Sequence, residues 1–382
     1  MPPAELAGAG PVSSLRERVL ALRDRLVPDP RFRRWAARFP PTRILARRRA
    51  AALFDLCAGF VYSQALLALV RLRVFDLLRD SPLTAAEVAA RRDLPVASVE
   101  RLLSAGVALR LLDRRSGGRF GLGPLGAAMP GNAGLEAMIE HHAVLYADLA
   151  DPVAVLRGGE TGLSRYWAYA RAESPGALRA EDVAEYSALM AASQAMIAEE
   201  VLDAYRDLRG HRRLMDVGGG EGAFLAAAAA RVPSLRVTLF DLPSVAARAA
   251  ARFARDGLSD RAETVGGDFR TDALPGGADL ISLVRVLHDH DDDAAHGLLR
   301  AAHAALPPGG RLLLAEPMAG TAGAEAMGDA YFGLYLLAMR SGRPRDEGEL
   351  RRFLEEAGFA RVRALPTRVP LLVRALVADR TI

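Results

Sequence analysis

Lysine is absent from this chain of 382 residues, cysteine is nearly so, and each absence removes a class of chemistry. All 50 basic residues are arginines, so no lysine amine is available as a general base or for a Schiff base. The single cysteine, Cys57, excludes an intrachain disulfide and a thiolate metal cluster. One free thiol is typical of a protein from a reducing cytoplasm.

Long hydrophobic runs and a signal peptide are also missing. No stretch approaches the roughly 20 uninterrupted apolar residues of a membrane span, and the first residues lack a signal pattern. The hydrophobic content of 51% nevertheless predicts a large core, and the length is sufficient for two domains. We therefore expect a cytoplasmic protein of two or more domains.

Residues 1–49 are predicted to form a basic, proline-punctuated arm. Residues 1–50 hold 12 arginines against 4 acidic residues, a local net charge of +8 in a chain whose total is +4. Phe32, Trp35 and Phe39 are interleaved with these arginines. A solvated or packing arm is the simplest interpretation, and a peripheral contact with an anionic membrane is the alternative.

Residues 50–130 have the pattern of a winged-helix domain. Apolar residues recur at spacings of three and four from Ala50 to Arg79, which indicates a helix. Thr84, followed three residues later by a glutamate, predicts a capping box at the start of a second helix. A third helix is expected over 96–109, and the segment 111–122 reads as a two-stranded wing.

A winged helix by itself suggests a DNA reader. The third predicted helix, however, carries only Arg101 as a basic residue before Arg110. A DNA-reading helix needs more, because phosphate contacts supply most of the affinity. We therefore expect no nucleic-acid partner.

The most informative stretch is 214–222, which reads Leu-Met-Asp-Val-Gly-Gly-Gly-Glu-Gly. A short apolar run ends at Asp216, glycines follow, and a helix-compatible run begins at Ala223. Such a strand, turn and helix N-terminus lets backbone N–H groups approach a ligand closely. The loop predicts a nucleotide-like cofactor. Its spacing, Gly218-x-Gly220-x-Gly222, is one residue tighter than the dinucleotide fingerprint.

Further elements follow this loop in a fixed order. A strand over 236–240 ends in Asp241, whose carboxylate suits the two hydroxyls of a ribose. After it come Gly267-Asp268-Phe269, then Arg285-Val286-Leu287-His288-Asp289, and then an apolar strand that ends in Glu316. This ordered set resembles the S-adenosylmethionine-dependent methyltransferases. More narrowly, it is similar to the O-methyltransferase family that includes the plant caffeate and flavonoid enzymes and their bacterial relatives.

The alternation of strands and helices from about Arg212 predicts a parallel sheet with right-handed crossovers. The last two strands, about 360–364 and 370–378, are only a loop apart and are predicted to pair antiparallel. The expected fold class is α/β, a Rossmann-like methyltransferase sheet that follows an N-terminal helical winged-helix domain. The resemblance implies that this N-terminal domain forms a homodimer. The expected segments are a basic arm (1–49), a winged-helix dimerisation domain (50–130), a helical substrate roof (131–210) and the cofactor-binding domain (211–382).

The resemblance implies S-adenosylmethionine as the cofactor and assigns residues to it. The implied cofactor-binding residues are Asp216, Gly218 and Gly220 around the methionine part, Asp241 and Leu242 at the ribose, Gly267, Asp268 and Phe269 at the adenine, and Arg285 close by.

His288 is the predicted general base. It follows an apolar strand at the carboxyl edge of the sheet, where ligands of open α/β sheets bind, and imidazole suits proton transfer near neutral pH. A lone histidine is more often structural, but Leu287-His288-Asp289 matches the family's Leu/Cys-His-Asp-Trp motif. By the same resemblance, Glu316 orients the histidine. The implied substrate-binding residues are His142, Trp167, Met190 and Asp289.

Two positions depart from the family pattern. His290 stands where the family has tryptophan, and Gly342-Arg343-Pro344-Arg345 has proline in place of a second base-flanking glutamate. The base is therefore held by one carboxylate, unless Asp346 or Glu347 substitutes. This difference leaves open C-methylation or methylation of an unusual alcohol.

The run from His288 to Asp293 also has the composition of a metal site. Adjacent residues at a helix start rarely converge on one ion, and the three aspartates suit a helix N-terminus. We expect no metal.

Segments such as 141–152 and 163–170 look similar to carotenoid-pathway O-methyltransferases of phototrophic bacteria. Those enzymes methylate the tertiary hydroxyl of acyclic carotenoids such as hydroxyneurosporene and demethylspheroidene. The alternatives are an aromatic polyketide O-methyltransferase and a bacteriochlorophyllide C-methyltransferase. A different class, a non-catalytic regulator that senses S-adenosylmethionine, is disfavoured by the intact set Asp216, Asp241, His288 and Glu316.

Overall fold

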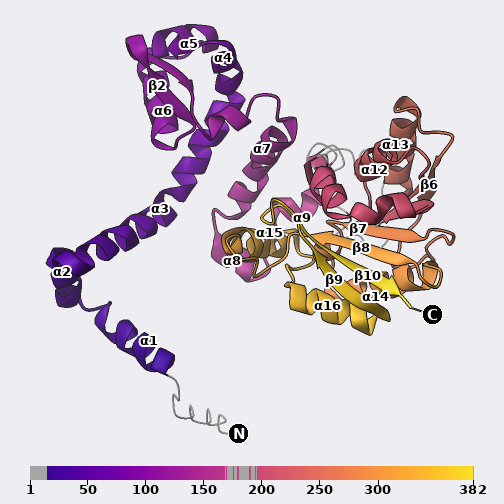
Figure 1. Ribbon diagram of the computed structural model, residues 1–382. Coiled ribbons are helices and arrows are strands. Elements are labelled where there is room, and N and C mark those ends of the chain that lie inside the picture. The colour runs from indigo at the N-terminus through magenta and orange to yellow at the C-terminus, as the bar shows by residue number, and fades with distance from the viewer. Residues whose placement is uncertain are drawn as a thin grey trace. The chain divides into compact units, whose positions relative to one another are not determined.

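The computed structural model describes residues 15–167, 169, 175, 179, 189–190, 194 and 196–381 (Figure 1). The chain divides into a unit that ends at Ala127 and a unit that begins at Ala128. Part of the segment 131–210, including Tyr186, lies outside the described residues, as do residues 1–14 of the arm.

The described part of the N-terminal arm is helical. It comprises α1 (Leu15–Leu26), α2 (Pro30–Arg38) and the start of α3 (Pro40–Arg71). The prolines open the helices here: Pro30 and Pro40 occupy first-turn positions, where a missing N–H costs nothing. The helix expected from Ala50 therefore begins ten residues earlier.

Helix α3 also ends before Arg79. The chain breaks at Leu72 and Arg73, where Arg73 takes a left-handed φ of 47°, and α4 (Val74–Asp80) follows. The apolar periodicity runs through both helices, so it could not reveal this break.

The winged-helix prediction for the first unit is confirmed. Helices α5 (Ala85–Arg92) and α6 (Val96–Ala108) follow α4, and Thr84 and Glu87 form the predicted capping box. Strands β1 (Leu83–Thr84), β2 (Leu112–Arg115) and β3 (Arg119–Leu122) pair in the order β1-β3-β2. The core is closed by fully buried side chains, among them Leu69, Leu103, Leu112 and Phe120.

Helix α3 is long and apolar enough to cross a membrane by length and composition alone, and only 17% of its apolar window is buried. Its side chains Leu53, Phe54, Leu56 and Phe60 are each more than 60% exposed. The absence of uninterrupted apolar runs concealed this, because Asp55 and small polar residues divide a stretch that is apolar overall.

The second unit begins with α7 (Ala133–Asp148), α8 (Pro152–Leu156) and α9 (Gly162–Tyr166), and residues 196–204 are also helical. The turn η4 (Arg206–Gly210) then leads into the sheet.

The sheet has seven strands in the order β6-β5-β4-β7-β8-β10-β9. Its strands are β4 (Arg213–Val217), β5 (Arg236–Asp241), β6 (Ala262–Gly266), β7 (Leu280–Val284), β8 (Arg311–Glu316), β9 (Phe359–Leu365) and β10 (Arg374–Arg380). Only β10 runs antiparallel to its neighbours, so the predicted parallel sheet and antiparallel final pair are confirmed.

Helices pack on both faces of this sheet (Figure 1). They are α12 (Ala223–Arg231), α13 (Pro243–Arg255), α14 (Asp292–Ala305) and α16 (Glu347–Glu356), with the π-helical turn η6 (Ala326–Tyr331) and α15 (Phe332–Met339) between β8 and α16. Along β4, Leu214 enters one hydrophobic cluster while Met215 and Val217 enter the other, as the alternation of a strand requires.

The order of the strands reverses between β4 and β7. The chain passes from β4 outward to β5 and β6, then returns to β7 on the other side of β4. In an open parallel sheet, ligands bind at the carboxyl ends of the strands at such a reversal.

Candidate active site

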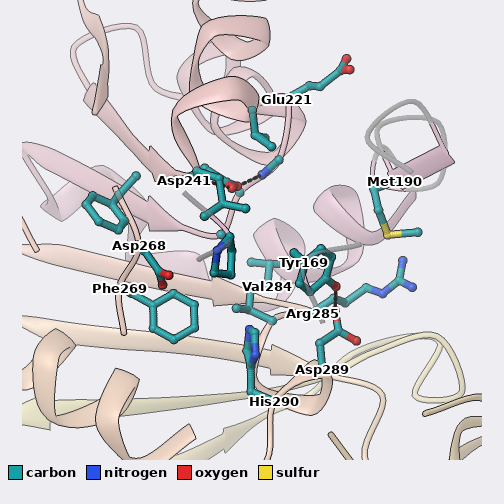
Figure 2. A pocket seen from close by; sticks show the side chains of 18 of the residues that line it. Tyr169, Met190, Glu221, Asp241, Asp268, Phe269, Val284, Arg285, Asp289 and His290 are labelled. Carbon is teal, nitrogen blue, oxygen red and sulfur yellow. Dashed lines mark hydrogen bonds between the residues drawn. The ribbon is translucent and has the colours of Figure 1, made fainter. Parts of the chain in front are cut away.

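A cavity lies at this reversal point, at the carboxyl ends of β4, β5 and β7 (Figure 2). Of the expected cofactor and substrate residues, it is lined by Gly218, Gly220, Asp241, Leu242, Gly267, Asp268, Phe269, Arg285, Trp167, Met190 and Asp289. In Figure 2, Asp268 and Phe269 lie at one end, and Tyr169, Arg285 and Asp289 lie at the other. Segments far apart in sequence therefore line one site.

The glycine loop after β4 requires its glycines for close approach. Gly218 has a left-handed φ of 70°, and its N–H donates to the Phe240 carbonyl at 2.8 Å. A Cβ at Gly219 would come within 2.3 Å of an Asp216 carboxylate oxygen. A larger residue at Gly219 would therefore collide with the buried carboxylate.

Asp216 lies beneath the loop and is not among the cavity-lining residues. Its Oδ1 accepts a 2.6 Å hydrogen bond from the Ser282 hydroxyl, while its buried Oδ2 has no hydrogen-bond partner. Burial raises the pKa of this carboxyl to about 7, and the charge of Asp241 contributes to the same shift.

Asp241 ends β5 and holds the loop from the other side. Its Oδ2 accepts from the Gly220 N–H at 2.8 Å, and its Oδ1 accepts from the Leu242 N–H at 2.7 Å. Burial raises the pKa of Asp241 to about 6 even though these two bonds favour the carboxylate. The site thus concentrates negative charge that the protein only partly neutralises.

Asp268 follows β6 and is partnered within its own loop. Its carboxylate accepts hydrogen bonds from the Arg270 backbone N–H at 3.0 Å and from the Arg270 guanidinium at 2.9 Å. Burial works to raise the pKa of Asp268, but Arg270 outweighs it and holds the pKa below its usual value. The next residue, Phe269, presents its ring to His290 at a centroid distance of 5.0 Å.

Arg285, after β7, occupies a strained position. Its φ is 59°, in the left-handed region that non-glycine residues rarely adopt, while its N–H donates to the Ala315 carbonyl of β8 at 2.8 Å. Strain of this kind collects at functional sites.

His288 lies in the short turn η5 (Leu287–Asp289), buried directly behind Asp289. Its Nδ1 donates to Glu316 Oε2 at 2.5 Å, and Glu316 Oε1 accepts from the Val286 and Leu287 N–H groups at 3.1 and 2.7 Å. The Nε2 of His288 lies 3.2 Å from Asp289 Oδ1. The structure thus joins His288 to Glu316, although neither lines the cavity itself.

The charge balance around His288 favours its cation. Burial acts to lower the pKa of His288, but Asp289 and Glu316 together raise it above its usual value. Neither alternative carboxylate considered for the base is near it: Asp346 caps α16 by accepting from the Glu349 N–H, and Glu347 pairs with Arg351 and Arg374.

The implied substrate residues separate into two groups. Trp167, Met190 and Asp289 line the cavity, whereas His142 does not: its Nε2 is hydrogen bonded to the Tyr331 hydroxyl at 2.7 Å. Burial lowers the pKa of His142 and raises that of Tyr331 to about 12, so this pair is neutral.

Other residues that sequence reasoning did not assign to the site also line the cavity. Among them are Tyr169, Arg270 and His290. Tyr169 donates to Asp289 Oδ2 at 2.9 Å. The departure from the family's tryptophan marked the position of His290, but no spacing rule indicates that Tyr169 reaches a turn 120 residues later.

The site fits a nucleoside that carries a positive charge. The two carboxylates with raised pKa values, one of which has a buried oxygen without a hydrogen-bond partner, favour a cationic group over a dinucleotide pyrophosphate. The backbone N–H groups of the glycine loop suit an anionic group on the same ligand. Among the described residues, no group of three or more histidine, cysteine or acidic side chains is arranged to hold a metal ion.

Comparison with known proteins identifies two family matches. A family model described as an O-methyltransferase domain matches residues 146–360, and one described as an O-methyltransferase dimerisation domain matches residues 54–129.

Three relatives illustrate the similarity. Demethylspheroidene O-methyltransferase of Cereibacter sphaeroides is 46% identical, covering 93% of this chain and 94% of the relative. The protein of the same name from Rhodobacter capsulatus is 42% identical, covering 98% and 92%. The SAH-bound crystal structure of CalO1, a methyltransferase in calicheamicin biosynthesis, superposes with a TM-score of 0.71 at 27% identity, covering 87% of this chain and 98% of that one.

The raised pKa values of Asp216 and Asp241 predict that the affinity for S-adenosylmethionine depends on pH. Because both carboxyls become protonated between about pH 8 and about pH 5, attraction for the cationic ligand falls over this window. Calorimetric titration should show weaker binding as the pH falls, with proton release on binding at about pH 6. An affinity that stays constant across this window would contradict the prediction.

Replacing Asp241 by asparagine tests the same charge directly. Loss of a charged hydrogen-bonding group costs about 1.5–3 kcal/mol, so the dissociation constant should rise by roughly tenfold to a hundredfold. Asp260→Asn, which changes an exposed aspartate in the turn between α13 and β6, is the matched control and should leave binding unchanged. Equal affinities for wild type and Asp241→Asn would rule out this role for Asp241.

Proposed function

The chain belongs to the S-adenosylmethionine-dependent O-methyltransferase family, and from this premise we propose that it methylates the tertiary hydroxyl of an acyclic carotenoid. The observation that carries the proposal is the 46% identity, over 93% of the chain, with a demethylspheroidene O-methyltransferase. Trp167 and Met190, which line the cavity, supply apolar surface for such an acceptor.

The proposed chemistry needs two things from the protein. When bound, S-adenosylmethionine supplies a methyl group that is already activated on a sulfonium. The chain must hold the acceptor oxygen in line with that methyl group and accept the hydroxyl proton. The glycine loop and Asp241 contact one partner, the buried Asp216 supports the loop from beneath, and the apolar residues of the cavity orient the other.

His288 is the proposed general base. Because Glu316 accepts the Nδ1 proton, the lone pair of neutral His288 is on Nε2, the nitrogen that lies against Asp289, and Asp289 lines the cavity. As the acceptor O–H bond breaks, its proton passes to His288 Nε2, which leaves the oxygen electron pair free for a methyl group. S-adenosylmethionine would supply that methyl group by cleavage of its C–S bond and would leave as the neutral thioether. Glu316 stabilises the resulting imidazolium, which then loses its proton to water.

We further propose that the four segments of the chain divide the work as their sequences predict. The dimerisation-domain match at residues 54–129 supports a homodimer, in which the exposed apolar residues of α3 are covered by a second copy. Residues 131–210 contribute the acceptor side of the cavity, and residues 211–382 bind the cofactor.

The N-terminal helices are the proposed point of contact with an anionic membrane. A cytoplasmic enzyme that binds a membrane in this way could reach a carotenoid dissolved in it. In α2, Trp35 and Phe39 stack at a centroid distance of 4.9 Å yet remain 50% and 41% exposed. Arg31, Arg34 and Arg38 surround the same aromatic pair. Exposed aromatic rings flanked by arginines suit the boundary between lipid headgroups and acyl chains.

Replacing His288 by alanine should abolish most methylation. Loss of a general base lowers the rate by about 10²–10⁴-fold, whereas cofactor affinity should stay within about twofold because His288 is outside the cavity lining. The measurement is transfer of labelled methyl from S-adenosylmethionine to an acyclic carotenoid with a tertiary hydroxyl. His303→Ala, which removes a histidine that packs on Phe359 near the far end of α14, is the matched control.

Two results would count against the proposal. If wild-type protein binds the cofactor but labels no carotenoid, the acceptor is wrong and polyketide phenols and chlorophyllides become the substrates to test. Full methylation by His288→Ala would instead exclude an alcohol base and favour C-methylation.

Membrane contact is tested separately with vesicles. The Trp35→Ala/Phe39→Ala variant should bind anionic phosphatidylglycerol vesicles at least tenfold more weakly than wild type, because two interfacial anchors are lost. The control, Leu156→Ala/Leu371→Ala, removes two exposed apolar side chains elsewhere. Cosedimentation that is equal for both variants, or independent of lipid charge, would contradict the contact.

A further inference from the structure

The catalytic histidine of this chain contacts a carboxylate on each ring nitrogen, although the family's second glutamate is replaced by Pro344. Glu316 Oε2 lies 2.5 Å from Nδ1, and Asp289 Oδ1 lies 3.2 Å from Nε2. We propose that Asp289 is the second carboxylate that positions His288, and that residues 341–345 hold Asp289 in place. This inference rests on the proposed function of His288 as a base.

Both the side-chain carboxylate and the backbone carbonyl of Asp289 are held by hydrogen bonds. Its Oδ2 accepts from the Tyr169 hydroxyl at 2.9 Å, which leaves Oδ1 directed toward His288. Its backbone carbonyl accepts from the Ser341 hydroxyl at 2.6 Å. Figure 2 shows the tyrosine and the aspartate joined at the edge of the cavity. The carboxylate therefore cannot rotate away from His288 without breaking its hydrogen bond with Tyr169.

The segment that lost the glutamate still supports the turn. Gly342, with a φ of 77°, packs so closely that a Cβ there would come within 2.0 Å of the His288 carbonyl oxygen. Its N–H donates to Asp291 Oδ1 at 2.9 Å. No other residue could occupy this position without displacing the backbone of the base.

Arg345 adds a buried clamp. Only 2% of this residue is exposed, and its guanidinium donates to the carbonyls of Leu287 and His290, each at 2.8 Å, and to Asp292 at 2.7 Å. These bonds enclose the turn that carries both His288 and Asp289. A buried arginine whose N–H groups donate to backbone carbonyls holds the loop in one conformation.

The arrangement makes His288 a stronger base. Glu316 fixes the proton on Nδ1, so a neutral imidazole would turn its Nε2 lone pair toward the Asp289 carboxylate. Two facing acceptors repel, and a proton on Nε2 removes the repulsion. The opposing groups are Arg285 and His290, whereas Phe332 packs its ring on the imidazole without charge.

A base of this kind suits an acceptor that resists deprotonation. A tertiary alcohol holds its proton far more tightly than a phenol does, and a more basic imidazole increases the driving force for proton transfer. The acceptor hydroxyl can approach Nε2 only when His288 is neutral, that is, after Nε2 has released its proton. Methylation should therefore increase as the pH rises through the His288 pKa.

The test is Asp289→Asn, which keeps the shape and the partners of Asp289 but removes its charge. The His288 resonance, identified by its loss in His288→Ala, should titrate at a pH lower by about one unit or more in this variant. The acidic limb of the pH–rate profile should move in the same direction, with a plateau rate reduced roughly tenfold. Asp289→Glu should restore part of the His288 titration shift and part of the plateau rate.

Asp293→Asn is the matched control, because it changes an exposed aspartate in the first turn of α14. It should leave the His288 titration and the pH–rate profile unchanged. If Asp289→Asn raises KM but leaves the His288 titration in place, Asp289 binds substrate only and the inference fails. Because the titration needs no acceptor, it decides this inference even if no carotenoid is methylated.

Discussion

The hydrogen bond between Glu316 and His288 is the constraint on which the site depends. Glu316 ends β8 and accepts from two backbone N–H groups of the neighbouring β7 turn as well as from the imidazole. These three partners satisfy both oxygens of a carboxyl group that is only 2% exposed, as a buried polar group requires. One interaction therefore joins two parallel strands, sets the histidine tautomer and, in the proposed mechanism, stabilises the imidazolium of His288.

The carboxyl groups near the glycine loop differ from Glu316, because their charge is not fully compensated by the protein. Asp216 and Asp241 are held with incomplete neutralisation, which raises their pKa values and costs folding free energy. We predict that a cationic ligand relieves this cost, so that the same two carboxylates that destabilise the protein without ligand strengthen binding. Asp268, which lies beside Phe269 in the cavity lining, differs from these two carboxyls, because Arg270 holds its pKa below the usual value.

Sequence reasoning predicted the parts of the structure that local chemistry determines. The apolar strand 280–284, the glycine loop at 218–222 and the capping box at Thr84 each depend on a few adjacent residues, and each is present. The parallel order of the sheet followed from the alternation of strands and helices.

The contacts between distant segments could not be predicted. Tyr169 reaches Asp289 and His142 pairs with Tyr331 only because helices before the sheet pack beside turns after it. The sequence left open whether Asp346 or Glu347 takes the place of the missing glutamate. In the structure Asp346 caps α16, and Glu347 pairs with two arginines. The carboxylate that lies 3.2 Å from His288 Nε2 belongs to the adjacent residue, Asp289, and this contact depends on the bend of η5.

The most direct test of the account is the fate of the acceptor oxygen. Wild-type protein would be given S-adenosylmethionine with a deuterated methyl group and an acyclic carotenoid whose tertiary hydroxyl carries ¹⁸O, and the product would be analysed by mass spectrometry. The account predicts a methyl ether that contains both labels on one fragment. A product that carries the deuterated methyl group on carbon, or no labelled carotenoid at all, would contradict it.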